Sequence, residues 1–202
     1  MSYSVHNHRL LKAGTPVAFH ASPNQGGAVK RSYLILHYTA GATGAGAVSW
    51  LTNPKAKASA HLVLDRNGSV TQLVPFDRIA WHAGESKWGS IVGLNAHSIG
   101  IEIVNRGKLR RSEAGDWKDW SGRAVPPDEV VVAQHKHESA PAGWHTFTEE
   151  EIEEVVEIGL ALHEKYEFLD VLGHEDIAPV RKVDPGPAFP LASIAAKILG
   201  RQ

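Results

Sequence analysis

The stretch Tyr33-Leu34-Ile35-Leu36-His37-Tyr38 decides how the chain is expected to fold. It is a short apolar run of strand length, which is typical of a buried β-strand. It ends in a histidine and a tyrosine, and residues 39–44 follow as a flexible turn rich in Gly and Thr. That turn leads into a short helix expected at about residues 45–51, which Pro54 ends.

Further strands are expected on either side of this run. Residues 61–65 and 69–74 are apolar stretches flanking Arg66-Asn67-Gly68, and Asn-Gly in that setting is a strong signal for a β-hairpin. Residues 98–104 predict a second core strand, and a short strand is expected near residues 170–172. These segments would form one sheet.

Two helices are expected to cover that sheet. Thr148-Glu149-Glu150-Glu151 has the form of a capping box, and apolar residues recur behind it at helical spacing to about Tyr166. Pro190 opens a last helix with an apolar stripe. Residues 1–31 are polar and are expected to form an extended lead-in. Residues 105–147 are expected to be a long insertion. It either forms part of a substrate groove or has small secondary-structure elements of its own.

This order of elements predicts a single α/β domain over residues 1–202, with a central mixed β-sheet flanked by helices. The length of 202 residues is sufficient for one compact domain with a hydrophobic core. Hydrophobic residues make up 43% and charged residues 21%, which argues against disorder. We expect a monomer.

Charge and composition exclude several classes of protein. The net charge is -1 and no basic block is present, so no nucleic-acid partner is expected. No apolar run approaches the roughly 20 residues of a membrane span, and the first residues do not have the pattern of a signal peptide. The chain has no cysteine but 12 histidines. A transition-metal site would therefore use imidazole and carboxylate ligands.

Three residues are candidates for such a site. His37 lies where one strand ends, and His174 lies directly after another. Asp184 follows ten positions later, beside a proline that restricts the backbone. Ends of strands are where a rigid scaffold presents ligands, although structural histidines are also common there. Two imidazoles and one carboxylate suit zinc and leave one coordination position open for water, as in catalytic sites.

Glu102 is a candidate general base. Ile99, Ile101 and Ile103 share one face of the predicted strand, whereas Gly100 and Glu102 share the other. A carboxylate within an apolar strand is costly to bury unless it is paired or has a chemical role. A structural ion pair is the alternative. Gly100 would leave room for substrate or for a closely packed neighbour.

Several blocks of the chain, taken together, resemble a known family. They are Leu34-Ile35-Leu36-His37-Tyr38-Thr39-Ala40, Ser59-Ala60-His61-Leu62-Val63, Ala80-Trp81-His82-Ala83-Gly84, Asn95-Ala96-His97-Ser98-Ile99-Gly100-Ile101-Glu102, Gly173-His174-Glu175-Asp176-Ile177-Ala178-Pro179 and Lys182-Val183-Asp184-Pro185-Gly186-Pro187. In this order, over roughly residues 33–190, they are similar to the AmpD and peptidoglycan-recognition-protein family of zinc-dependent N-acetylmuramoyl-L-alanine amidases, the type 2 amidases.

The resemblance implies the fold of that family and one Zn²⁺ ion held by His37, His174 and Asp184. It implies Glu102 as the acid/base and Lys182 as a cation near the developing oxyanion, where a fixed positive charge lowers the barrier. The implied reaction is hydrolysis of the amide between N-acetylmuramic acid and L-alanine. The implied partner is peptidoglycan or a soluble muropeptide.

Other polar and aromatic residues leave two interpretations open. His61, Trp81, His82 and Asn95 are candidates for substrate binding. The alternatives are hydrogen-bonded structural histidines, a packed tryptophan and an asparagine that caps a turn. For His135-Lys136-His137, a solvated loop is preferred to a second metal site.

Two other functions remain compatible with the sequence: a peptidoglycan-binding module without catalysis, and a zinc peptidase acting within the stem peptide. The tyrosine that some family members carry before the histidine of the second block is Ala60 here. Without a signal peptide, we expect a cytoplasmic wall-recycling enzyme or a phage or prophage endolysin that stays in the host cytoplasm until lysis.

Overall fold

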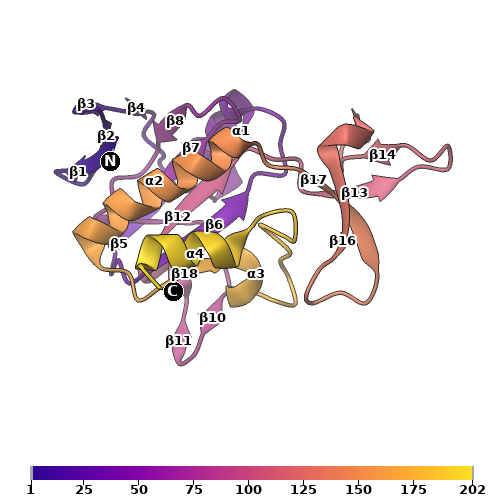
Figure 1. The fold of residues 1–202 in the computed structure, drawn as a ribbon. Helices are drawn as coiled ribbons and strands as arrows, with labels where there is room; N and C mark the ends of the chain where they lie inside the picture. Colours follow the sequence, from indigo (N-terminus) through magenta and orange to yellow (C-terminus); the bar gives the residue numbers. More distant parts are fainter. Residues whose placement is uncertain (1, 202) are drawn as a thin grey trace.

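The computed structural model describes residues 2–201 and has a six-stranded mixed sheet at its centre (Figure 1). In spatial order the strands are β18 (Asp170–Gly173), β6 (Tyr33–Tyr38), β12 (Ser98–Ile103), β7 (Leu62–Leu64), β8 (Val70–Gln72) and β4 (Ala18–Phe19). The first four run parallel, β8 is antiparallel to β7, and β4 is parallel to β8. The predicted mixed sheet and the β7–β8 hairpin are confirmed.

The register of β6 and β12 decides what each face of the sheet carries. Leu34 and Leu36 belong to the main hydrophobic core, whereas Ile35 packs in a separate cluster on the opposite face. Because side chains alternate along a strand, His37 shares its face with Ile35. Glu102 pairs with His37 across the two strands and therefore lies beside it.

Helices α2 (Glu149–Tyr166) and α4 (Leu191–Leu199) pack together over the main core. The predicted capping box of α2 is present, since the Glu151 backbone N–H donates to the Thr148 hydroxyl and the Thr148 backbone N–H donates to the Glu151 carboxylate. Helix α1 (Gly44–Leu51) packs near β7 in a second cluster. The one-turn helix α3 (His174–Ile177) follows β18, and the 3₁₀ turns are η1 (Pro54–Ala56), η2 (Leu94–Ala96) and η3 (Pro127–Glu129).

The N-terminal segment is more structured than an extended lead-in, so that prediction is wrong. Strands β1 (Tyr3–His6), β2 (Arg9–Lys12) and β3 (Thr15–Pro16) form an antiparallel sheet, and β5 (Gln25–Ala28) pairs with β9 (Arg78–Ala80). Tyr3 and Leu10 are buried in the main core. The strands are too short for a visible local periodicity, and the partners of β4 and β5 lie far away in the sequence.

The insertion, residues 105–147, projects from one side of the molecule (Figure 1). Its antiparallel sheet has the order β15 (Ala124–Val125), β14 (Trp117–Lys118), β13 (Lys108–Arg111), β17 (Pro141–His145) and β16 (Val130–Gln134). A small hairpin, β10 (Lys87–Trp88) and β11 (Ile91–Val92), projects from another part of the molecule, away from the insertion (Figure 1). Among residues 2–201, no helix has both the length and the apolar character needed to span a membrane.

Candidate active site

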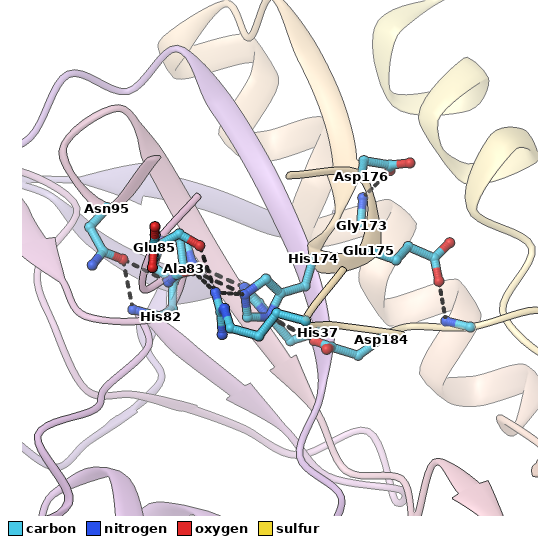
Figure 2. A network of polar contacts seen from close by, with 12 residues as sticks. His37, His82, Ala83, Glu85, Asn95, Gly173, His174, Glu175, Asp176 and Asp184 are labelled. Atoms are coloured by element: carbon cyan, nitrogen blue, oxygen red, sulfur yellow. Dashed lines mark hydrogen bonds and ion pairs between the residues drawn. The ribbon is translucent and has the colours of Figure 1, made fainter. Parts of the chain in front are cut away.

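Three side chains from separate parts of the chain converge on one point (Figure 2). His37 lies near the end of β6, His174 follows β18, and Asp184 lies in the loop before α4. The Nδ1 atoms of the two histidines are 2.9 Å apart, and each is 3.1 Å from Oδ2 of Asp184. All three residues are buried, and their ligand atoms could hold a metal ion. The predicted ligand set is brought together as one cluster.

Hydrogen bonding prepares His174 to be a ligand. Its Nε2 lies 3.0 Å from the carbonyl oxygen of Ala83. A carbonyl can only accept, so Nε2 carries the proton and Nδ1 keeps its lone pair. Fixing the tautomer through the second ring nitrogen is the usual arrangement around metal-binding histidines.

A longer chain of hydrogen bonds prepares His37. Its Nε2 is 3.0 Å from Nδ1 of His82, and Nε2 of His82 is 3.3 Å from the hydroxyl of Ser98. That hydroxyl donates to the carbonyl oxygen of Leu94 over 2.6 Å. With each group donating to the next, Nδ1 of His37 is left unprotonated and faces the cluster.

The charge states of the cluster also fit a cation. Burial, followed by the charge of His174, lowers the pKa of His37 to about 4. Burial alone would raise the pKa of Asp184, but the adjacent His174 and His37 outweigh it and hold that pKa well below its usual range. Near neutral pH, His37 is a neutral imidazole and Asp184 is an anionic carboxylate, which are the forms that bind a transition metal.

Glu102 projects into the same site from β12. Its Oε2 is buried without a hydrogen-bond partner in the described part of the chain. Burial and then the negative charge of Asp184 raise the pKa of Glu102 to about 8, while Lys182 opposes this shift. An unpaired carboxyl group with a pKa of about 8, beside a cluster that could hold a metal ion, has the properties of a general base.

A groove of about 770 Å³ opens above the cluster. Glu102, His174, Lys182 and Asp184 line it together with residues from the loop after β6, from α1 and from the insertion. Lys182 therefore lies on the same groove as Glu102. The groove gives a ligand access to the cluster.

A comparison with protein families agrees with this arrangement. Residues 27–187 match the family model described as N-acetylmuramoyl-L-alanine amidase. The chain belongs to this amidase family.

Individual members of the amidase family are similar over most of the chain. The N-acetylmuramoyl-L-alanine amidase AmiD of Escherichia coli (strain K12) is 32% identical over 177 residues, which are 83% of this chain and 53% of AmiD. The chain thus spans about half the length of the curated relatives that it matches.

Two solved structures support the fold. AmiD from E. coli, in complex with anhydro-N-acetylmuramic acid-L-Ala-D-gamma-Glu-L-Lys, has a TM-score of 0.61 at 27% identity, covering 97% of this chain and 65% of that one. AmpDh3 from Pseudomonas aeruginosa, in complex with anhydromuramic pentapeptide, has a TM-score of 0.60 at 28% identity, covering 83% and 59%. The predicted amidase fold is therefore confirmed.

The four predicted substrate-binding residues of this amidase-family chain divide into two pairs. Trp81 and His82 line the groove. His61 is fully buried, and its Nδ1 accepts from the backbone N–H of Gly100 while its Nε2 lies 3.0 Å from the carbonyl oxygen of Arg78. With both ring nitrogens bound to backbone, His61 has a structural role and its prediction as a substrate ligand is wrong.

Asn95 is likewise bound to backbone. Its Oδ1 accepts from the N–H groups of His82 and Ala83, at 3.0 and 2.6 Å (Figure 2). It does not line the groove. These bonds do not fit substrate binding, and they do not cap the turn before β12, which is the alternative prediction; Asn95 instead holds the backbone of residues 82 and 83.

Gly100 makes room for His82. A Cβ at position 100 would lie 2.4 Å from the His82 ring, far inside van der Waals contact. The expectation of a closely packed neighbour beside Gly100 is confirmed. The glycine lets the His82 ring lie against β12, where it supports His37.

His135 is buried, so the expectation of a solvated loop is wrong for this residue. Its Nε2 lies 2.7 Å from Oε2 of Glu175, which also accepts from the backbone N–H of Gly186. Lys136 binds the other Glu175 oxygen at 2.9 Å. The backbone N–H of Glu175 donates to the carbonyl oxygen of Asp184, so Glu175 connects the insertion to the loop that carries a predicted metal ligand.

Three groove residues were not predicted from the sequence as site residues. Arg181 donates to the carbonyl oxygens of Ala83 and Glu85, both at 2.8 Å, and lines the groove. Trp50 and Trp120 line it from α1 and from the insertion. Arg181 adjoins the last block of the family motif, whereas no motif or spacing distinguishes the two tryptophans.

Proposed function

We propose that this chain is a zinc-dependent N-acetylmuramoyl-L-alanine amidase, which hydrolyses the amide joining N-acetylmuramic acid to L-alanine of the peptide stem. The observation that carries the proposal is the convergence of His37, His174 and Asp184 beside the unpaired carboxyl group of Glu102. The relatives' printed names and their muropeptide complexes support this choice of substrate.

The donor set fits zinc. Two neutral imidazole nitrogens and one carboxylate oxygen, without a thiolate, are a common ligand set of catalytic zinc sites. Their mutual separations of 2.9 and 3.1 Å suit three corners of one coordination polyhedron. When bound, zinc would polarise the substrate carbonyl and promote ionisation of a water molecule.

Glu102 would move the proton. Its Oε2 accepts a proton from the attacking water, and the same proton is then delivered to the leaving amine nitrogen of L-alanine as the amide bond breaks. For this, the carboxyl group must begin ionised. The positive charge of Lys182 already lowers its pKa, and a divalent cation in the cluster would lower it further.

Lys182 and Arg181 would support the reaction from the groove wall. The ammonium group of Lys182 is a positive charge for the oxyanion that develops on the carbonyl oxygen. Arg181 holds the backbone of Ala83 and Glu85, and Ala83 in turn binds Nε2 of His174. Arg181 therefore helps to keep one ligand in its required orientation.

Digestion of defined substrates tests this function. The purified chain is incubated with intact sacculi and with soluble anhydro-muropeptides, with and without a chelator, and the products are identified by mass spectrometry. We expect release of the intact stem peptide with a free L-alanine amine, and its loss on chelation. Cleavage within the stem would indicate a peptidase, and binding to sacculi without any product would indicate a non-catalytic module.

The same digestion separates the two biological roles. Activity on intact sacculi would favour an endolysin, which must attack the polymer. Activity confined to anhydro-muropeptides would favour a wall-recycling enzyme.

A further inference from the structure

Three tryptophans with exposed rings gather on the groove. The chain has six tryptophans, and Trp50, Trp81 and Trp120 line the groove with exposed fractions of 59%, 37% and 68%. By contrast, Trp144 is buried and Trp88 packs in a hydrophobic cluster. Exposed large apolar side chains that collect at one place usually mark a binding surface.

The ring of Trp120 is held in a fixed orientation. Its indole N–H donates to the carbonyl oxygen of Ala40 over 2.6 Å, although the two residues are 80 positions apart. Ala40 lies in the loop after β6, so this bond attaches the turn between β14 and β15 to the groove wall. The indole's single hydrogen-bond donor is thereby satisfied. Because the ring is already ordered before a ligand arrives, binding would not cost the conformational entropy of ordering it.

The wall that carries Trp50 has no charged residue. Every lining residue between positions 38 and 59 is uncharged, whereas the charged lining residues Glu102, Arg181, Lys182 and Asp184 belong to the region around the metal-binding cluster. An acidic peptide stem would gain nothing electrostatic from the uncharged wall. A neutral sugar chain suits it better, because pyranose rings have apolar C–H faces that pack on aromatic rings while their hydroxyl groups stay in water.

From these observations we infer that Trp50 and Trp120 form a binding surface for the glycan strand of polymeric peptidoglycan, beyond the sugar whose amide is cleaved. This inference rests on the proposed function for the choice of polymer. The ligand class is a β-1,4-linked chain of N-acetylated amino sugars. Trp81, nearest in sequence to His82, would lie towards the reacting end.

The experiment compares substrates of different length. Trp50→Ala and Trp120→Ala are assayed on sacculi and on an anhydro-muropeptide with a single sugar. We expect the ratio of sacculus activity to single-sugar activity to fall about tenfold in each variant. Trp120→Phe, which keeps an aromatic ring but loses the bond to Ala40, should fall between the wild type and Trp120→Ala. Val132→Ala, an exposed residue of the insertion outside the groove, is the matched control and should keep the wild-type ratio.

A binding measurement separates this inference from the proposed function. Titration with a β-1,4-linked N-acetylglucosamine tetramer should change tryptophan fluorescence in the wild type, with about tenfold weaker binding in Trp50→Ala and Trp120→Ala. Tetramer binding without cleavage of any substrate would overturn the amidase but support the glycan surface. An unchanged activity ratio, or equal losses on both substrates, together with unaltered tetramer binding in the variants, would overturn the glycan surface. The thermal midpoint of each variant checks that it is folded.

Discussion

The central sheet and the insertion of residues 105–147 contribute differently to the groove. The sheet places His37, Glu102 and His174 at the carboxyl ends of three adjacent parallel strands, β6, β12 and β18. The insertion supplies no member of the candidate metal cluster formed by His37, His174 and Asp184. It reaches the site through Trp120 on the wall and through His135 behind the ligand loop.

This difference suggests that the sheet carries the catalytic groups, whereas the insertion adjusts their activity. Groups at the ends of neighbouring parallel strands are fixed by the backbone hydrogen bonds of the sheet, which suits the close tolerances of catalysis. The insertion has its own sheet and contacts the groove and the ligand loop through side chains such as Trp120, His135 and Lys136. We therefore expect changes in the sheet to abolish activity and changes in the insertion to tune it.

The largest effect is expected from His37→Ala. Loss of one of three ligands should lower zinc content well below one ion per chain and reduce amidase activity to background. Zinc content after dialysis is measured by atomic absorption. His61→Asn, a change at a buried histidine that is not a ligand, is the control and should keep its zinc. Full occupancy in His37→Ala would contradict the assignment of this ligand.

Glu102→Gln should lower turnover by about 10²-fold or more, the usual scale for removal of a general acid/base group. Because Glu102 is not among the ligand residues, zinc content should remain that of the wild type. Steady-state kinetics on a soluble muropeptide, combined with metal analysis, checks both expectations. Unchanged turnover would remove Glu102 from the mechanism.

A smaller effect is expected where the insertion supports the ligand loop. His135→Ala and Glu175→Gln should each weaken zinc affinity by about 10-fold to 100-fold, the range for partners that orient a ligand. The affinity is measured by competition with a chromogenic chelator. If the two residues act as one unit, the double variant should be no weaker than the weaker of the two single variants.

Glu129→Gln is the matched control for these variants. Glu129 also pairs with a buried histidine of the insertion, His145, at 3.0 Å, but its hydrogen bonds remain within the insertion. Zinc affinity should therefore be unchanged in Glu129→Gln. Equal losses in Glu129→Gln and Glu175→Gln would show that the insertion acts only through general stability.

The smallest effect concerns stability at acid pH. Burial lowers the pKa of His61 to about 4, below the ordinary value of 6.5. Between pH 4 and pH 6.5 the unfolded chain binds more protons at His61 than the folded chain does. The free energy of unfolding therefore decreases as the pH falls below about 6.5. His61 alone should contribute a loss of about 1 kcal/mol between pH 7.5 and 5.5.

Urea unfolding at several pH values measures this contribution. His61→Asn and the wild type are compared, both with saturating zinc, so that the pH dependence of metal binding is common to the two proteins. The stability of His61→Asn should fall less steeply with acid. Parallel curves would show that His61 does not titrate in this range.

Apart from β4, the strands of the central sheet were predictable because each carries its signal locally, and so was helix α2. The apolar run of β6, the Asn-Gly turn between β7 and β8, and the capping box of α2 are all read within a few residues. The cluster of His37, His174 and Asp184 was predictable because its residues lie in blocks that resemble a known family. These blocks belong to the sheet and its adjoining loops.

The contacts of the insertion could not be predicted in the same way. His135 contacts Glu175, which lies 40 positions later, and Trp120 donates a hydrogen bond to Ala40, which lies 80 positions earlier. Neither pair shares a spacing or periodicity that a sequence pattern could reveal. The five short N-terminal strands were missed for a similar reason, since β4 and β5 pair with strands that lie far away in the sequence.

The pairing of β6 with β12 has a consequence for how such a chain can change. Side chains alternate between faces, so a one-residue slip of β12 would turn the carboxyl group at position 102 away from the cluster and into the layer beneath α2 and α4. A single deletion inside Ser98–Ile103 would thus have two effects: it would remove the proton acceptor from the site, and it would place a charged group in the apolar interior. Conservative replacements along this strand leave the alignment intact, whereas any change in its length would disable both hydrolysis and folding.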